Sequence, residues 1–189
     1  MTSHTRRVLE LGVGLGLALT LVLTALADWH QRTAARVRAD TIRLHILANS
    51  DTWEDQLCKL AVRDAVLQTA ADALQDCETS EQAEARLRAL LPALEQTARL
   101  TAKGQNVTVQ LQKQDFTARE YGRFSLPEGE YTALRVTLGA GEGRNWFCVL
   151  YPALCVSASE ARYPGRAENA LVFGKYEIRS ALWDALTGA

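Results

Sequence analysis

The chain has 189 residues, of which 48% are hydrophobic and 23% are charged, enough for one domain with a buried core. Its 21 basic and 22 acidic residues give a formal net charge of -1, which argues against a nucleic-acid partner, because such proteins present a basic face. The sequence contains no internal repeat and no low-complexity block.

The N-terminus has the three-part layout of a secretory signal. A short basic stretch precedes an uncharged, mostly apolar run of 14 residues, Leu11 to Thr24, and Ala25 and Ala27 then occupy the small-residue positions that signal peptidase reads. The run is short for a membrane span, which needs about 20 residues. We therefore favour a cleaved signal peptide over residues 1–27, with an uncleaved membrane anchor as the alternative. In both cases the chain after Asp28 crosses the membrane.

Residues 28–40 are polar and basic and predict a stem, so that residues 41–189 form the domain proper. The side chains of residues 41–49 alternate between two faces, which predicts a strand. Ile42, Leu44 and Ile46 would point to one face, and Arg43, His45 and Leu47 to the other. We expect His45 to be a structural histidine of that strand rather than a catalytic one.

A first helix is predicted to follow that strand and to end near Gln75. Asp51 and Glu54 have the spacing of a capping box at its start. Its apolar stripe would consist of Trp53, Leu57, Leu60, Asp64, Leu67, Ala71 and Leu74. Because a buried lone charge is costly, we expect Asp64 to be a partnered structural carboxylate, with a recognition residue as the alternative.

A second helix is predicted over residues 79–100, with Thr79 and Gln82 as a capping box. Pro92 should kink or divide it. Its buried stripe would consist of Ala83, Leu87, Leu90, Leu91, Leu94 and Ala98.

Three further strands are predicted over residues 106–116, 130–139 and 145–152. The glycine-rich stretch "GAGEG" between the last two predicts a hairpin. Residues 168–188 predict a final helix. The order strand, two helices, three strands, helix predicts a single α+β domain with a mainly antiparallel sheet.

The cysteines divide into a close pair and two distant ones. Cys148 and Cys155 are seven positions apart with Pro152 between them, which can turn the chain back to the roughly 4.4–6.8 Å Cα separation of a disulfide. Because an exported domain meets an oxidising environment, we favour a disulfide here, with two buried free thiols as the alternative. Cys58 and Cys77 would lie about 28 Å apart on one helix and could not pair with each other.

The sequence shows no catalytic constellation. No serine lies in a Gly-x-Ser-x-Gly turn, and the Cys and His residues lack the spacing of a zinc site. We therefore expect no enzymatic activity, no metal and no cofactor, and a domain that works by contact. Trp146 would suit an interaction patch if it is exposed on an edge strand, and packing in the core is the alternative.

Two long stretches resemble stage II sporulation protein R of endospore-forming bacteria. The stretch "LHILANSDTWEDQLCKLAVRDAVL", residues 44–67, is similar to a strand-to-helix segment of that family. The stretch "LPEGEYTALRVTLGAGEGRNWFCVLYPALC", residues 126–155, is similar to its strand, glycine-rich turn and second strand. With the N-terminal signal, the likeness spans about residues 8–156. Phe147 and Ala153 depart from the family pattern, which usually has tryptophan and proline there.

The resemblance implies a signalling protein that is made in the forespore and exported to the space between the forespore and mother-cell membranes. There it would activate a membrane-embedded aspartic protease of the mother-cell septal membrane, which processes the sigma-E precursor. An uncleaved N-terminal segment would anchor the protein in the forespore membrane. The alternatives are a cell-envelope hydrolase and a structural protein of the forespore envelope.

The motifs of the family fall on a defined set of residues in this chain. They are Asn49, Asp51, Asp55, Gln56, Arg63, Asp64, Tyr131, Arg135, Asn145 and Trp146, with Cys148 and Cys155. We expect Arg63 or Arg135 to neutralise Asp64. We place the receptor surface near residues 139–147, which include Arg144.

Overall fold

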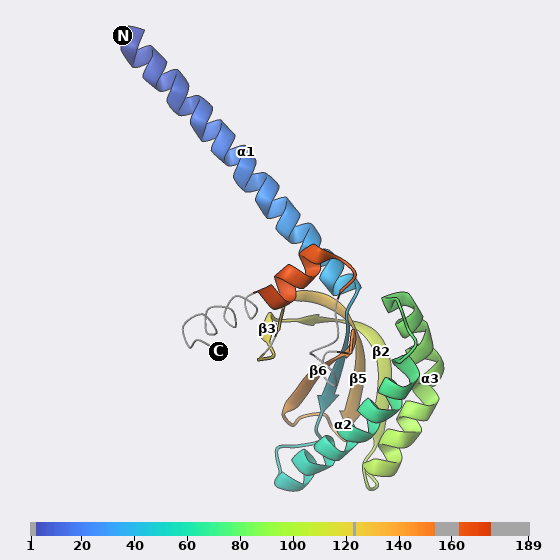
Figure 1. Cartoon of the computed structure of the whole chain (residues 1–189). Helices are drawn as coiled ribbons and strands as arrows, with labels where there is room; N and C mark the ends of the chain where they lie inside the picture. The colour runs from blue at the N-terminus through green and yellow to red at the C-terminus, as the bar shows by residue number, and fades with distance from the viewer. Residues whose placement is uncertain (1–2, 123, 154–162, 175–189) are drawn as a thin grey trace, which may run out of the picture.

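The computed structural model describes residues 3–122, 124–153 and 163–174 of the chain. A single long helix, α1 (Ser3–Ala39), leads into the folded domain (Figure 1). Its apolar side chains from Val8 to Leu26 are exposed, and the helix is long and apolar enough to cross a membrane. This agrees with a signal sequence or membrane anchor. Three residues near its end, Thr33, Ala34 and Val37, are buried in the domain.

The domain is built on a mixed four-stranded sheet with the order β2-β5-β1-β6. The strands are β1 (Ile42–Leu47), β2 (Val107–Phe116), β5 (Gly129–Leu138) and β6 (Asn145–Tyr151). β1 runs parallel to β5, whereas the β1–β6 and β2–β5 pairs are antiparallel. The α+β prediction is therefore confirmed. A second small sheet pairs β3 (Arg119–Glu120) with β4 (Ser125–Leu126), which the sequence did not predict.

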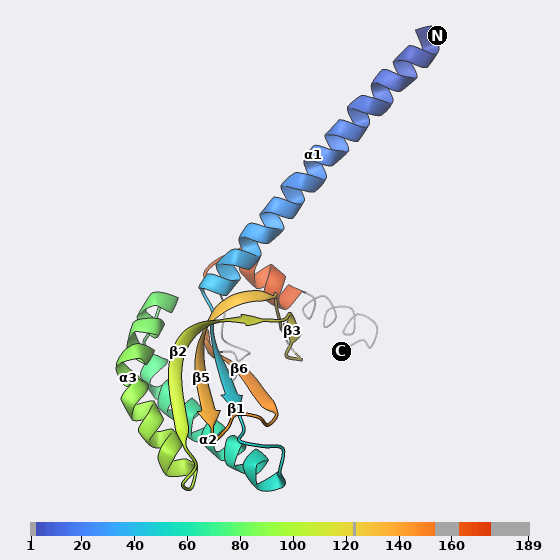
Figure 2. The same ribbon diagram turned by 180° about the vertical axis from the view of Figure 1, so that it is seen from behind.

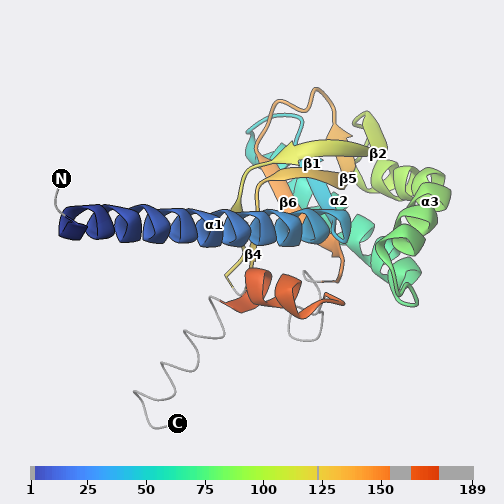
Figure 3. The same ribbon diagram turned by 90° about the horizontal axis from the view of Figure 1, so that it is seen from above.

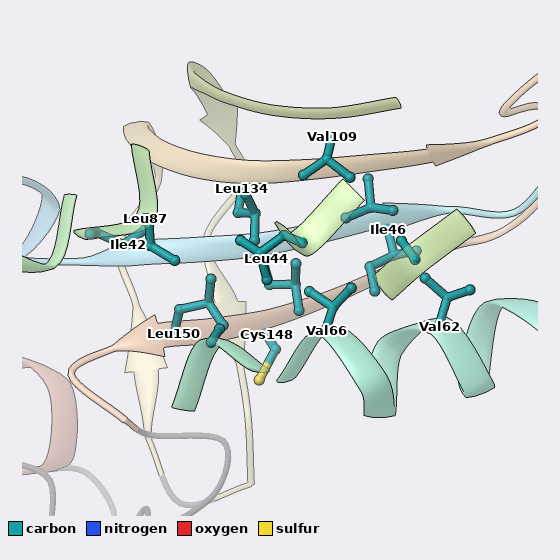
Figure 4. Packing of buried hydrophobic residues seen from close by; sticks show 14 of the residues in the cluster. Ile42, Leu44, Ile46, Val62, Val66, Leu87, Val109, Leu134, Cys148 and Leu150 are labelled. Carbon is teal, nitrogen blue, oxygen red and sulfur yellow. The ribbon is translucent and has the colours of Figure 1, made fainter. Parts of the chain in front are cut away.

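Two helices, α2 (Trp53–Leu74) and α3 (Ser80–Thr101), cover one face of the sheet (Figures 1 and 2). Between them and the sheet lies the main aliphatic layer, in which Ile42, Leu44 and Ile46 of β1 pack against Val62 and Val66 of α2 (Figure 4). Both faces of β1 are buried, because all six of its residues are covered. Neither α2 nor α3 covers the other face of the sheet, and in this sense we call it the helix-free face.

The buried face of α2 differs from the predicted stripe. Its buried residues are Asp55, Lys59, Val62, Val66, Ala70 and Leu74. Trp53 is 73% exposed, Leu57 is 46% exposed, and Asp64 faces solvent. Both sets of residues have helical spacing, so periodicity alone could not choose between them. The cap is also different, since the hydroxyl of Thr52, not the carboxylate of Asp51, accepts from the helix.

α3 follows the prediction closely. The hydroxyl of Thr79 accepts from the backbone N–H of Gln82 at 3.2 Å, and the Gln82 side chain accepts from the Glu78 N–H at 2.9 Å. Leu87 and Leu94 lie in the centre of its buried face. The helix continues through Pro92 without interruption, so it is not divided there.

The predicted hairpin between β5 and β6 is wrong, because these two strands do not pair with each other. β1 lies between them and pairs with both. The connecting residues 139–144, which we call the β5–β6 loop, therefore pass over the end of β1. The reason is that both faces of β1 are buried, and a strand that is buried on both faces takes a central position in the sheet.

At the end of the sheet where α1 enters, a second cluster joins α1 to a helical segment, residues 166–174 (Figure 3). The buried members of this cluster are Val37, Phe124, Leu126, Val149, Tyr163, Val172 and Phe173. The hydroxyls of Thr41 and Tyr163 are 2.7 Å apart, and Arg36 pairs with Glu168 at 3.6 Å. The end of α1 is thus part of the domain. The rest of the predicted final helix lies outside the described residues.

Candidate functional site

The β1–α2 connection, residues 48–52, and the β5–β6 loop meet at the end of the sheet remote from α1 (Figures 1 and 2). We call this end, residues 48–56 and 139–144, the tip. Four of the residues singled out by the family motifs lie here, Asn49, Asp51, Asp55 and Gln56, all from the first motif stretch, and Arg144 joins them from the second. The two stretches therefore meet at the tip as well as along β1, which pairs with β5 and β6.

Asn49 joins the two loops through its side chain. Its amide nitrogen donates to Oδ2 of Asp55 at 2.8 Å, and its Oδ1 accepts from the backbone N–H of Ala140 at 2.9 Å. Two backbone bonds reinforce the contact, from the Glu142 N–H to the Asn49 carbonyl at 3.2 Å and from the Gly143 N–H to the Ala48 carbonyl at 2.9 Å. The β5–β6 loop is thus held against the end of β1 at several points.

The glycines of the β5–β6 loop are explained by this close approach. Gly139 has φ 53°, the left-handed region, and a Cβ atom there would lie 2.0 Å from Oδ1 of Asn49. A Cβ atom on Gly143 would lie 2.2 Å from the Ser50 carbonyl oxygen. The glycine-rich stretch is needed for passage over β1 rather than for a tight hairpin turn.

Asp55 is the centre of the hydrogen-bond network at the tip. Its carboxylate accepts from the Ser50 hydroxyl at 2.5 Å, from Asn49, and from the Gln105 amide at 2.5 Å. The hydrogen bond from Ser50, followed by that from Asn49, holds the pKa of Asp55 below its ordinary value. A carboxylate with this many donors stays ionised and fixes the two loops, so its role is to anchor them rather than to transfer protons.

Gln56 and Lys59 extend this network along the first turns of α2. The Gln56 amide donates to the Ser50 carbonyl at 2.9 Å, and the Lys59 ammonium donates to Gln56 Oε1 at 2.7 Å and to the Arg144 carbonyl at 2.9 Å. Burial lowers the pKa of Lys59. The sequence reading missed Lys59 and Gln105. Lys59 follows Asp55 by four positions and Gln56 by three, a helical spacing that could have placed it on the same face.

The exposed part of the tip is different in character from its buried part. The backbone N–H of Arg144 donates to Oδ1 of Asp51 at 2.7 Å, while the Arg144 side chain is 81% exposed. Trp53, two residues after Asp51, is exposed as well. The tip therefore exposes an arginine and a tryptophan on a backbone that is held by the hydrogen bonds of Asn49 and Asp55 beneath it.

Arg63, Asp64 and Trp146 form a group beside the tip. The Arg63 guanidinium bonds to Asp64 at 2.7 Å and lies 5.2 Å from the centre of the Trp146 ring. Of the two arginines that the sequence analysis named as partners for Asp64, Arg63 and Arg135, it is Arg63 that pairs with it. Because the Asp64 side chain is 65% exposed, this pair does not compensate a buried charge. Trp146 is half-buried and packs against the main aliphatic layer.

Tyr131 and Arg135 do not belong to the tip. Both lie on the helix-free face, where Tyr131 is fully buried and donates to the Pro127 carbonyl at 2.5 Å. Arg135 lies opposite His45 in the register of β5 and β1. His45 stacks on Phe147 with 4.5 Å between ring centres, and its two nitrogens bond to Gln114 and Asn145, each at 3.1 Å. Burial lowers the pKa of His45, which fits the expected structural role.

The structure describes three of the four cysteines, Cys58, Cys77 and Cys148. Cys148 is buried in β6, and Cys155 lies outside the described residues, so their disulfide stays a prediction. Cys58 and Cys77 are free, half-buried thiols. Within the part of the chain that the structure describes, no group of three or more His, Cys, Asp or Glu residues is arranged to hold a metal ion.

Comparisons with known proteins point to one family. A family model described as stage II sporulation protein R matches residues 38–161 of the chain. Stage II sporulation protein R of Bacillus subtilis (strain 168) is 41% identical over 118 residues, which are 60% of this chain and 53% of that relative. The chain thus spans about half the length of the curated relative that it matches. No solved structure matches it significantly.

Proposed function

Because the chain belongs to the stage II sporulation protein R family, we propose that it is an exported signalling protein of sporulation. In this proposal it is made in the forespore and activates a membrane-embedded aspartic protease of the mother-cell septal membrane. The protease, not this chain, then processes the sigma-E precursor. Activation is a population shift, in which the signalling protein binds the active arrangement of the protease more tightly than the inactive one.

The observation that carries the proposal is the position of the tip relative to α1. If α1 stays in the forespore membrane, residues 28–39 add about 18 Å of helix beyond it. A ten-residue strand such as β5 adds roughly 33 Å more. The tip then points away from the forespore membrane and toward the facing membrane, where the protease would lie.

The fixed backbone of the tip also supports a role in recognition. Loops that are already ordered lose little conformational entropy on binding, which leaves more free energy for affinity. Tryptophan and arginine are the residue types most often found at energetic centres of interfaces. Trp53 and Arg144 are therefore our choice for the residues that contact the protease.

Reconstitution in a non-sporulating bacterial host tests this function. The sigma-E precursor, its membrane protease and this chain are expressed together, and precursor cleavage is followed by immunoblot. We expect cleavage with the full chain and none when residues 1–27 are removed, because export is then lost. Absence of cleavage by a full chain that is shown to be exported and folded would reject the function.

The same assay tests the tip separately. We expect Arg144→Glu and Trp53→Ala to reduce cleavage strongly, since each removes an exposed contact. The matched control is Arg88→Glu on α3, which breaks only a surface pair with Glu84 at 2.6 Å. Cleavage that is equal in all three variants would reject the tip as the contact surface while leaving the function in place.

The size of the mature protein distinguishes a released signal from an anchored one. Cleavage after Ala27 would leave residues 28–39 attached to the domain, where Thr33, Ala34 and Val37 are packed. The mature protein would then be 27 residues shorter than the chain. A full-length product would show that α1 remains as an anchor.

A further inference from the structure

Arg43 is completely buried in β1 on the helix-free face, among aromatic rings. The centre of its guanidinium lies 3.9 Å from the centre of the Phe116 ring, 4.9 Å from that of Tyr131 and 5.9 Å from that of Tyr121. Its Nη2 donates to the Tyr121 hydroxyl at 2.6 Å. The guanidinium is thus enclosed by flat apolar surfaces and holds a single hydroxyl oxygen.

The other two nitrogens of this guanidinium are buried without an acceptor. Nε and Nη1 have no hydrogen-bond partner among residues 3–122, 124–153 and 163–174. Among the described residues no carboxylate forms an ion pair with Arg43. An arginine stays protonated in proteins, so the site holds a full positive charge. The rings offset part of the cost of burying it, but they leave the N–H groups unsatisfied.

The surrounding phenols do not neutralise this charge. Burial raises the pKa of Tyr131 to about 12, so its hydroxyl is neutral at physiological pH. Burial also raises the pKa of Tyr163, which bonds to Thr41. Within the described part of the chain, the site therefore lacks a paired negative group, and it offers donors that an added acceptor would satisfy.

The geometry of a guanidinium defines which acceptor fits. Each of its two edges presents a pair of parallel N–H bonds that match the two oxygens of a carboxylate. One edge consists of Nε and Nη2 and the other of Nη1 and Nη2, so both edges share the nitrogen that Tyr121 now occupies. Nη2 carries one N–H on each edge, and the Tyr121 oxygen accepts from this nitrogen by a single hydrogen bond. A carboxylate on the edge that Tyr121 occupies would replace the Tyr121 oxygen and satisfy the orphan nitrogen beside it.

We propose that Arg43 is a binding site for a carboxylate group and that the Tyr121 hydroxyl holds the position of one carboxylate oxygen until it arrives. The site is independent of the contact surface at the tip. Entry is through Tyr121, which is half-buried and lies directly after the two-residue strand β3. β3 and β4 pair over two residues, and the Tyr121 N–H also donates to the Phe124 carbonyl at 2.8 Å. This short ladder opens at lower cost than the ten-residue pairing of β2 with β5. The carboxylate comes from a small organic acid or from an acidic side chain of a polypeptide.

NMR of the full chain in detergent, with ¹⁵N-labelled arginine, tests the site directly. Sodium acetate is titrated against sodium chloride at equal ionic strength, and a Gly-Glu-Gly peptide with blocked ends is titrated in parallel. We expect the Arg43 Nε–H or Nη–H resonances to move downfield with acetate or with the peptide, and not with chloride. Saturation by acetate assigns the site to small acids, and saturation by the peptide alone assigns it to a polypeptide.

Two variants make this experiment decisive. Arg43→Lys keeps the charge but loses the paired N–H edge, so binding should weaken at least tenfold. Tyr121→Phe keeps the ring but removes the competing oxygen, so binding should become tighter. Arg135→Lys, on the same face of the neighbouring strand, is the matched control and should bind as the wild type does. An equal response to chloride, sulfate and acetate, or resonances that no carboxylate moves, would overturn the proposal even if Arg43→Lys does not fold.

Discussion

The aliphatic layer beneath α2 and α3 and the hydrogen-bonded tip stabilise the same sheet in different ways. The layer brings together buried side chains such as Leu44, Leu87 and Leu134, whose contribution grows with the apolar area removed from water. The tip contains few apolar contacts and depends on individual donors and acceptors around Asp55. Truncating a side chain of the layer should therefore lower the free energy of unfolding in proportion to the buried volume that is lost. At the tip, the loss of a single hydrogen-bonding atom should be enough to lower it.

The largest expected effect is in the aliphatic layer. Leu134 is fully buried in β5, and Leu134→Ala should lower the free energy of unfolding by about 2–5 kcal/mol, because it removes buried area and leaves a cavity. Chemical denaturation measures this loss. Leu100→Ala is the control, since Leu100 is 78% exposed and should change stability by less than about 0.5 kcal/mol. Similar losses in both variants would mean that this layer is not the main core.

The next effect is steric and belongs to the tip. Gly143→Ala places a methyl group against the Ser50 carbonyl, which should cost about 1–3 kcal/mol through displacement of the β5–β6 loop. Denaturation gives the loss, and hydrogen exchange of the Gly143 and Glu142 amides should show local opening. Gly174→Ala, with no atom within 4 Å of the added carbon, is the control. Unchanged exchange at the loop would contradict the close approach.

A smaller effect is expected from the charge on Asp55. Asp55→Asn keeps the size of the side chain but replaces one accepting oxygen by an NH2 donor that faces the donors of Asn49, Ser50 or Gln105, so the midpoint of thermal unfolding should fall. The pKa of Asp55 lies below 3.8 in the folded protein, so the unfolded chain takes up its proton first as pH falls. The wild type therefore loses this stabilisation below about pH 4, and its advantage over the variant should shrink there. A constant difference from pH 7 to pH 3 would exclude this carboxylate as the source.

The smallest effect should come from the exposed surface of the tip. Arg144→Ala removes a side chain whose contact with Asp51 is 3.8 Å long and open to solvent, while the backbone bonds of residue 144 remain. We expect a change of less than about 0.5 kcal/mol in the free energy of unfolding. A loss above about 1 kcal/mol would show that the side chain, and not the backbone, holds the β5–β6 loop.

The two regions also differ in how far the sequence predicts them. The α3 stripe was predicted correctly because its apolar residues repeat on one side only. The buried face of α2 was not, because Leu57 and Leu60 on one side compete with Val62 and Val66 on another. Periodicity reports which residues share a face, and it does not report which face meets the sheet.

The tip could not be predicted from periodicity at all. Asn49, Asp55 and Gln105 come from a loop, a helix and a second loop, and their hydrogen bonds depend on where the strands are placed. The resemblance to the family drew attention to Asn49, Asp55 and Gln56 without giving their contacts. Gln105 carried no sequence feature that marked it, whereas Lys59 could have been found from its helical spacing to Asp55 and Gln56. No sequence feature marked the enclosure of Arg43 by aromatic rings.

The central place of β1 has a consequence for how the chain folds. β1 is synthesised before either of its neighbours, and its first residue, Ile42, pairs with Thr132, 90 residues later. Its other neighbour, β6, ends at Tyr151. Such distant pairings are slow to form, because a long stretch of chain must be ordered before they do. An apolar strand therefore stays unpaired until most of the protein has been made, and a chaperone that holds β1 during this interval should raise the yield of folded protein.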